Sequence, residues 1–99
     1  MKPDALEFSA VARAELDEVV EYIAQRNPTA AVRLRAAIGA ALTALTAPHP
    51  RTEGPPAMLN TGEPCRRCFV HPVTLYYDRT PGLLTVLHVH HHAREPIAR

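Results

Sequence analysis

Apolar side chains recur every three to four residues in two successive stretches of the N-terminal half. This spacing gives each stretch one apolar face and predicts two amphipathic helices, over residues 10–26 and from Pro28 to about Thr46. Asn27 is a typical cap and Pro28 suits a first helical position, so the helices should form an αα-hairpin almost without a loop. The apolar faces consist of Ala12, Leu16, Val19, Val20 and Ile23 in the first helix and Ala31, Leu34, Ile38, Leu42 and Leu45 in the second.

The remaining faces of the two predicted helices differ in character. On the first helix they carry acidic residues, which we expect to be solvated: Glu15, Asp17, Glu18 and Glu21. On the second helix they carry small residues, which would permit close approach to the first helix: Ala30, Ala36, Ala37, Ala40, Ala41 and Ala44.

Alternating or continuous apolar runs predict strands in the rest of the chain. A short segment at Leu6–Ser9 predicts a first strand that ends at a capping Ser9. Cys65–Val70 and Val73–Arg79 predict two strands joined by a turn at His71-Pro72.

The long segment from Ala47 to Pro64, both included, contains five prolines and two glycines. Proline lacks a backbone donor and restricts φ, so neither a helix nor a central strand can run through this segment. We therefore expect one long irregular connection before the predicted strands.

The last strand begins at Leu83, after a turn at Thr80-Pro81-Gly82, and ends near Glu95. Its uninterrupted apolar start predicts a central place in the sheet. Its histidine-rich exit, closed by Arg94, would lie at the sheet's end, where a partner can reach it. Strict alternation gives one face of Leu83, Thr85, Leu87 and Val89, and a second face of Leu84, Val86, His88, His90 and His92.

The element order predicts an α+β fold, β-α-α-β-β-β, with an N-terminal strand and an αα-hairpin packed on a small, mainly antiparallel sheet. Residues 1–99 should form one domain, because 46% hydrophobic residues suffice for a single core. No apolar run approaches the roughly 20 residues of a membrane-spanning helix, and the N-terminus lacks a signal-peptide segment. We expect a cytoplasmic protein without a membrane partner.

The charge is low overall but unevenly distributed. The net charge is +1, and all six histidines lie within residues 47–99. Lys2 is the one lysine among eleven basic residues, which favours arginine contacts to carboxylate or phosphate over lysine chemistry. Arg66, Arg67, Arg79 and Arg94 would form a basic patch if neighbouring strands bring them together; scattered surface arginines are the alternative.

Cys65 and Cys68 have the spacing of a metal site, which histidines of the last strand would complete. Residues three apart on a strand, however, face opposite ways and lie about 10 Å apart. We therefore expect two reduced thiols and no metal or cofactor. The last histidines can serve in packing, in partner contact or as a general acid or base. Tyr76 and Tyr77 should face opposite sides, one in the core and the other open to solvent beside the arginines.

These segments together resemble the RelE/ParE superfamily of toxins from bacterial type II toxin–antitoxin pairs. The resemblance is carried by the order and spacing of four pieces, Phe8 to Leu16, Tyr22 to Ala31, Leu75-Tyr76-Tyr77-Asp78 and Val86 to Glu95. It implies a helical hairpin packed on a small antiparallel sheet, in agreement with the pattern itself.

The superfamily implies two alternative activities. RelE-like members are ribosome-dependent mRNA endoribonucleases, for which the candidates here would be His91, Arg94, Arg79 and Tyr77. ParE-like members inhibit DNA gyrase and are not nucleases. The absence of any lysine after Lys2, the low charge and the ParE-like opening and ending favour a gyrase inhibitor, and thus lean away from an enzyme. A degenerate member that only binds its partner is a third possibility.

The resemblance also implies a cognate antitoxin whose disordered tail folds along the toxin. The sequence offers this tail an apolar groove beside the hairpin and a set of basic residues. The predicted partner-binding residues are Arg66, Arg67, Arg79, His90, His92 and Arg94. In the nuclease alternative the partners would be the ribosome and mRNA.

Overall fold

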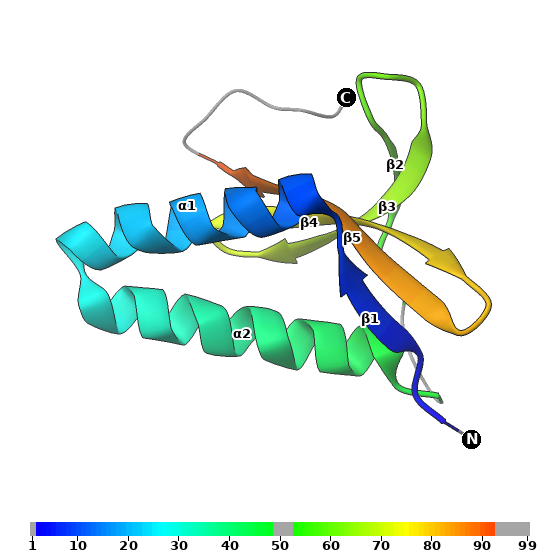
Figure 1. Ribbon diagram of the computed structural model, residues 1–99, viewed down its shortest axis with the longest axis horizontal. Helices are drawn as coiled ribbons and strands as arrows, with labels where there is room; N and C mark the ends of the chain where they lie inside the picture. The colour runs from blue at the N-terminus through cyan, green and yellow to red at the C-terminus, as the bar shows by residue number, and fades with distance from the viewer. Residues whose placement is uncertain (1, 49–52, 93–99) are drawn as a thin grey trace.

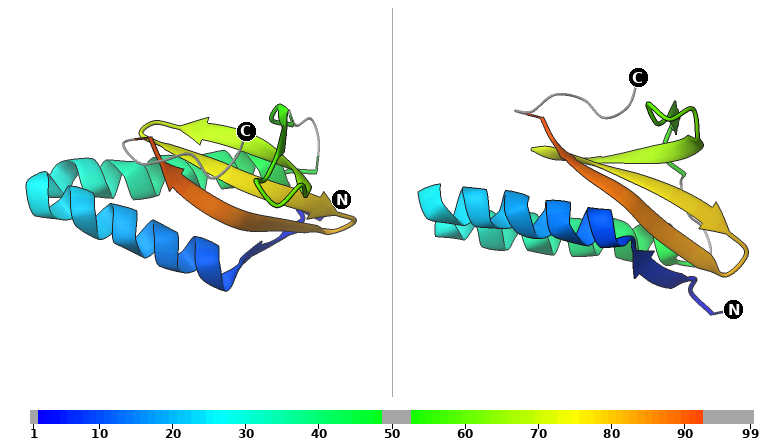
Figure 2. Two further views of the ribbon diagram at one scale, coloured as in Figure 1. Left: turned by 90° about the horizontal axis from the view of Figure 1, so that it is seen from above. Right: turned by 45° about the horizontal axis from the view of Figure 1, so that its top comes forward.

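Two helices and five strands make up the computed structural model, which describes residues 2–48 and 53–92. Both helices lie on one side of the sheet (Figure 1; Figure 2). The predicted α+β order is confirmed, with one short strand added. The elements are β1 (Ala5–Phe8), α1 (Ala10–Arg26), α2 (Pro28–Thr46), β2 (Pro56–Met58), β3 (Pro64–Val70), β4 (Val73–Thr80) and β5 (Leu83–His91).

Local capping explains why the helices begin and end where the sequence predicts. The Ser9 hydroxyl accepts a hydrogen bond from the Ala12 N–H at 3.0 Å and donates one to the Leu87 carbonyl at 2.9 Å. Asn27 ends α1 and begins α2, because its N–H donates to the Ile23 carbonyl and its side chain accepts from the Ala30 N–H. One residue therefore turns the chain between the helices.

The strands form a single sheet in the order β1-β5-β4-β3-β2. β5 lies between β1 and β4, so the predicted inner position of this strand is confirmed. β1 pairs with β5 in parallel and the other neighbours are antiparallel. The added strand β2 lies within the segment predicted to be irregular. It is an edge strand, so the missing N–H of Pro56 removes no hydrogen bond from the interior of the sheet.

A register shift between Tyr76 and Tyr77 interrupts the alternation of β5. Tyr77 pairs with Val86 and Tyr76 pairs with His88, so Leu87 is the extra residue of a β-bulge. Val89 therefore joins the helix-side core instead of sharing a face with Leu87. The predicted faces of the last strand are wrong beyond the bulge, because one inserted residue reverses the side to which every later side chain points.

The two faces of the sheet carry separate apolar clusters. The main core lies between the sheet and the helices and includes Tyr77, Leu75 and Val86, all fully buried. A smaller cluster on the opposite face contains Leu59, Cys65 and Tyr76. Tyr76 is 5% exposed, so the expectation that one tyrosine is open to solvent is wrong. The chain around β2 supplies Leu59 and Ala57 to this second cluster.

The alanines of α2 contribute less to helix packing than the sequence suggests. Ala36, Ala37, Ala40 and Ala44 are exposed, and the larger residues of the apolar stripe, such as Leu34 and Ile38, make the core. Neither helix in the described part of the chain combines the length and apolar character needed to span a bilayer.

Candidate partner-binding site

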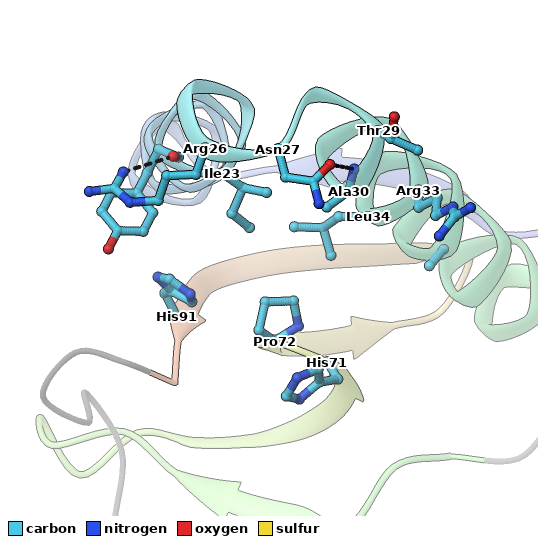
Figure 3. A pocket seen from close by; sticks show the side chains of 12 residues that line it. Ile23, Arg26, Asn27, Thr29, Ala30, Arg33, Leu34, His71, Pro72 and His91 are labelled. Carbon is cyan, nitrogen blue, oxygen red and sulfur yellow. Dashed lines mark hydrogen bonds between the residues drawn. The ribbon is translucent and has the colours of Figure 1, made fainter.

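A cleft of about 490 Å³ opens between the hairpin turn and the ends of β4 and β5 (Figure 3). Ile23 and Leu34 face Pro72 across it, and His91 stands at the sheet side. Its interior is mainly apolar and its rim carries arginine and histidine. The lining consists of Tyr22, Ile23, Arg26, Asn27, Thr29, Ala30, Arg33, Leu34, Ala37, His71, Pro72 and His91.

Two arginines on the helices give the cleft a positive rim. Arg26 donates to the Tyr22 carbonyl at 3.1 Å, and its guanidinium carbon lies 3.8 Å from the centre of the Tyr22 ring. Arg33 makes no ion pair within residues 2–48 and 53–92 and is exposed. An apolar cleft bordered by such cations suits a partner that combines apolar side chains with carboxylates.

His91 belongs to the wall of this cleft. Its ring lies 5.6 Å from the Tyr22 ring in an edge arrangement, and the residue is only 9% exposed. The β-bulge places it on the helix side of the sheet, as it does Val89. His91 was a catalytic candidate only in the nuclease alternative, and in the structure it faces the helical hairpin.

His90 and His92 lie on the opposite face, near the β3–β4 turn. His90 is 9% exposed, and burial together with the charge of His92 lowers its pKa. His92 is exposed, and its Nε2 lies 2.8 Å from the hydroxyl of Thr74. The His71 and Phe69 rings are also close to His92, with centroids at 5.9 and 6.4 Å. Of the two predicted contact residues, His92 is thus the accessible one.

The arginines that would form a basic patch if they converged divide between the two faces of the sheet. Arg66 pairs with Tyr77 across the strands and Arg67 pairs with Tyr76, so consecutive arginines point to opposite sides. The guanidinium of Arg67 lies 5.3 Å from the centre of the Phe69 ring. Single alternation along β3 therefore separates Arg66 from Arg67, so the alternative of scattered arginines holds for this pair. Arg94 lies outside the described residues.

Arg79 is the centre of a polar network instead of an open contact residue. Its guanidinium donates to Asp4, to both carboxylate oxygens of Glu53 and, at 2.6 Å, to the Leu45 carbonyl. Its side chain is 16% exposed, and the hydrogen bonds to Glu53 raise its pKa. Arg66 approaches the same Glu53 at 3.8 Å. Arg79 thus joins the N-terminus, the end of α2 and β4.

The side chain of Tyr77 also lies in the interior of the protein. It is fully buried, and its hydroxyl accepts a hydrogen bond from the Gly54 N–H at 2.8 Å. Burial is the main cause that raises its pKa. The nuclease candidates Tyr77, Arg79 and His91 consequently do not gather around one open site.

Comparison with known proteins identifies the family. The model of a family described as ParE toxin of type II toxin-antitoxin system, parDE, matches residues 6–96. The chain belongs to the ParE toxin family. It is therefore a ParE-like toxin of the type II class, as the resemblance of its segments implied.

The fold of this ParE-family toxin has a counterpart among solved structures. One of them, described as the chromosomal ParDE TA system from P. aeruginosa, aligns with a TM-score of 0.70 and 15% identity. The alignment covers 89% of this chain and 95% of the other, so the likeness concerns the whole domain. No curated protein matches the sequence significantly.

The two cysteines of this toxin face opposite sides of β3, as their spacing predicts. Cys65 is buried in the small outer cluster, and Cys68 packs against the main core. Both thiols are free, and burial raises the pKa of each. In the part of the chain that the structure describes, no three histidine, cysteine or acidic residues are arranged to hold a metal ion.

Sequence reasoning missed several residues that shape the site. Tyr22, Arg26 and Arg33 border the cleft, yet nothing in the helical pattern distinguishes them from other exposed positions. Glu15 was expected to be solvated, but it is partly buried and accepts a hydrogen bond from the backbone of β5. Glu53 lies in the proline-rich connection and binds Arg79. No signal in the sequence pairs these acids with their distant partners.

Proposed function

We propose that this ParE-family toxin inhibits DNA gyrase, acts in the cytoplasm and is neutralised by a cognate antitoxin. The observation that carries the proposal is the family match, which extends from residue 6 to residue 96. Residues of both helices and of all five strands fall within it.

The arrangement of the nuclease candidates supports a target other than mRNA. Cleavage of a phosphodiester by a ribose hydroxyl needs a base, an acid and cations around one exposed phosphate. Tyr77 is buried, Arg79 is held by two carboxylates and His91 faces the hairpin. In the part of the chain that the structure describes, these three candidates do not surround one site that an RNA phosphate could reach.

The cleft beside the hairpin turn is the proposed site of the antitoxin. Its apolar lining can accept leucine-like side chains, and Arg26 and Arg33 can receive carboxylates at the rim. A disordered tail that folds into this cleft would bury apolar area at an ordering cost. Arg66, Arg67 and His92 also reach solvent at least partly and remain proposed contacts beyond the cleft.

The proposed target can be tested with the purified toxin. We expect induction of the toxin alone to arrest bacterial growth, and the purified protein to inhibit supercoiling by gyrase while leaving a cell-free translation reporter unaffected. Loss of translation with cleaved mRNA, and no effect on gyrase, would instead establish the endoribonuclease alternative. Growth without arrest and no effect in either assay would contradict toxicity towards both targets.

The proposed antitoxin cleft can be tested by reversing one charge. Arg33→Glu should weaken antitoxin binding by about tenfold in calorimetry, because one favourable charge contact becomes repulsive. Lys2→Glu is the matched control, since it changes the net charge equally at an exposed position away from the cleft. Equal weakening by both substitutions would indicate a general effect of charge and contradict the assignment of the cleft.

A further inference from the structure

Three histidines lie close together at the end of the sheet that carries the turn between β3 and β4. His90 belongs to β5, and His92 directly follows the last residue of this strand. Their ring centroids are 6.3 Å apart. His71 lies in the turn, and its ring centroid is 5.9 Å from that of His92. His92 is therefore close to two other imidazoles, one of which comes from a distant part of the sequence.

Hydrogen bonds and strand pairing hold this cluster in place. The N–H of His92 donates to the Pro72 carbonyl at 3.0 Å, so the chain after β5 is attached to the turn that carries His71. Thr74 pairs with His90 across the two strands and is 3% exposed. Its hydroxyl lies 2.8 Å from the Nε2 atom of His92. The backbone at His71 and His92 is thus fixed by contacts within the sheet and its turn.

The contact between Thr74 and His92 suits a histidine that binds a metal ion. Neutral imidazole is a common ligand of zinc, copper and nickel ions. A ligating histidine usually donates its second ring N–H to an oxygen atom, which fixes the tautomer and orients the ring. The Thr74 hydroxyl can accept such a bond from Nε2 of His92, and Nδ1 then keeps its lone pair for a metal ion.

The spacing of the rings is close to that of two histidines on one ion. With Zn–N bonds of about 2.0 Å and tetrahedral angles, the ring centroids of two ligating histidines lie about 5 Å apart. The rings of His71 and His92 need to approach by about 1 Å to reach this spacing. Both residues are exposed, so their side chains can rotate, whereas His90 is only 9% exposed.

The number of protein ligands follows from the same geometry. Within residues 2–48 and 53–92, no three histidine, cysteine or acidic side chains already surround one point. The arrangement therefore supports two imidazole ligands, with water in the remaining positions. Zinc imposes no coordination geometry of its own, so it tolerates such a mixed set of ligands.

We propose that His71 and His92 each supply one nitrogen to a zinc ion bound at this end of the sheet. From the sequence we expected no metal, because Cys65 and Cys68 face opposite sides of β3. The proposed site uses neither cysteine, and the turn supplies one of its two ligands. A bound ion would link the turn to the chain after β5, and its positions held by water are open to a carboxylate of a partner. The inference depends on neither the target nor the antitoxin.

Calorimetry with zinc chloride tests the site in the purified full-length toxin without a polyhistidine tag. We expect about one zinc ion per chain, and His71→Gln and His92→Gln should each weaken its binding at least about tenfold. His88→Gln is the matched control, because it removes a histidine of β5 that lies beside Glu15, and it should bind zinc as the parent does. Absence of zinc binding by the parent, or equal affinities of all four proteins, would overturn the inference. Equal weakening by His88→Gln would do the same.

Nuclear magnetic resonance identifies the ligands directly. Titration with zinc should shift the ring resonances of His71 and His92 and leave those of His88 unchanged. The cysteines are the competing thiol ligands, although burial raises the pKa of both. Zinc that shifts the Cβ resonances of Cys65 or Cys68, with the His71 and His92 rings unaffected, would place the ion elsewhere and overturn the proposed site.

Discussion

Glu15 of α1 accepts a hydrogen bond from the backbone N–H of Val89 in β5, at 2.9 Å. The two residues are 74 positions apart in the sequence. β1 pairs with β5 only as far as Val86, so no strand within residues 2–48 and 53–92 borders this edge of β5 beyond Val86. The carboxylate of Glu15 satisfies a backbone donor there, and the Nδ1 atom of His88 lies 3.2 Å from the same oxygen.

Removing this carboxylate should destabilise the fold. Glu15→Leu leaves the N–H of the buried Val89 without its acceptor, and we expect the free energy of unfolding to fall by about 1–3 kcal/mol. Glu15→Gln retains an acceptor oxygen and should lose less. Urea denaturation of the three proteins measures the difference; a Glu15→Leu variant as stable as the parent would show that the contact contributes nothing.

Arg79 should be difficult to replace even by lysine. A single ammonium group cannot reproduce the planar guanidinium that binds Glu53, Asp4 and the Leu45 carbonyl together. We expect Arg79→Lys to lower the free energy of unfolding by about 2–3 kcal/mol.

Arg35→Lys is the matched control for this substitution. Arg35 forms an exposed pair with Asp17, so its replacement should change stability by less than about 0.5 kcal/mol. Denaturation curves that shift equally for the two variants would mean that the network around Arg79 is no more important than a surface ion pair.

Two glycines should respond in opposite directions to alanine. At Gly54 an added Cβ would lie 1.9 Å from the carbonyl oxygen of Arg67, so the backbone must move and the hydrogen bond to Tyr77 is strained. We expect Gly54→Ala to lower the midpoint of thermal unfolding by several degrees, from a loss of about 1–3 kcal/mol. In Gly39→Ala the added Cβ enters open space and alanine replaces glycine within a helix, so the midpoint of thermal unfolding should rise. A raised midpoint for Gly54→Ala would contradict the close packing.

His90 should make the protein less stable in mild acid. Burial, and to a lesser degree the charge of His92, lowers its pKa from the ordinary value of 6.5, while Glu15 acts in the opposite direction. The unfolded chain therefore binds a proton on His90 at a higher pH than the folded chain does. Neutral His90 therefore makes its full contribution to stability above about pH 6.5. This contribution declines as the pH falls towards the lowered pKa of His90 in the folded state.

Replacing His90 tests this pH dependence. His90→Gln should lose less stability than the parent protein when urea denaturation is repeated from about pH 7 to pH 5. His92→Gln removes only the smaller of the two causes that lower the His90 pKa, so this variant should retain most of the loss of stability in acid. If the parent and His90→Gln proteins show the same dependence on pH, another group is responsible for it.

Local patterns account for the success of the sequence-based prediction of the elements. Apolar spacing located α1 and α2, and Ser9, Asn27 and Pro28 marked their ends, because capping involves residues at most a few positions apart. Strand boundaries around the His71-Pro72 turn followed from the same kind of local signal. The family resemblance rested on these segments, and the match over residues 6–96 confirms it.

The residues of the candidate site could be predicted from the sequence less well than the helices and strands. The basic residues Arg66, Arg67 and Arg79 were expected to act together, but their surroundings depend on register and on acids elsewhere in the chain. The cleft at the hairpin turn contains His91 because the bulge at Leu87 reverses the alternation of β5. A β-bulge depends on how two strands pair, so the hydrophobic pattern of one strand alone does not predict it.

The sequence alone determined the order of elements, the apolar stripes of both helices and the turns between strands, since each depends on neighbouring residues. The tertiary structure decided which side chains remain available to a partner. Arg79 binds Asp4 from 75 positions away, and Glu15 reaches Val89 across a similar distance. Such contacts form only when segments that are far apart in the sequence pack together. No local pattern along the chain can therefore identify the two residues that meet.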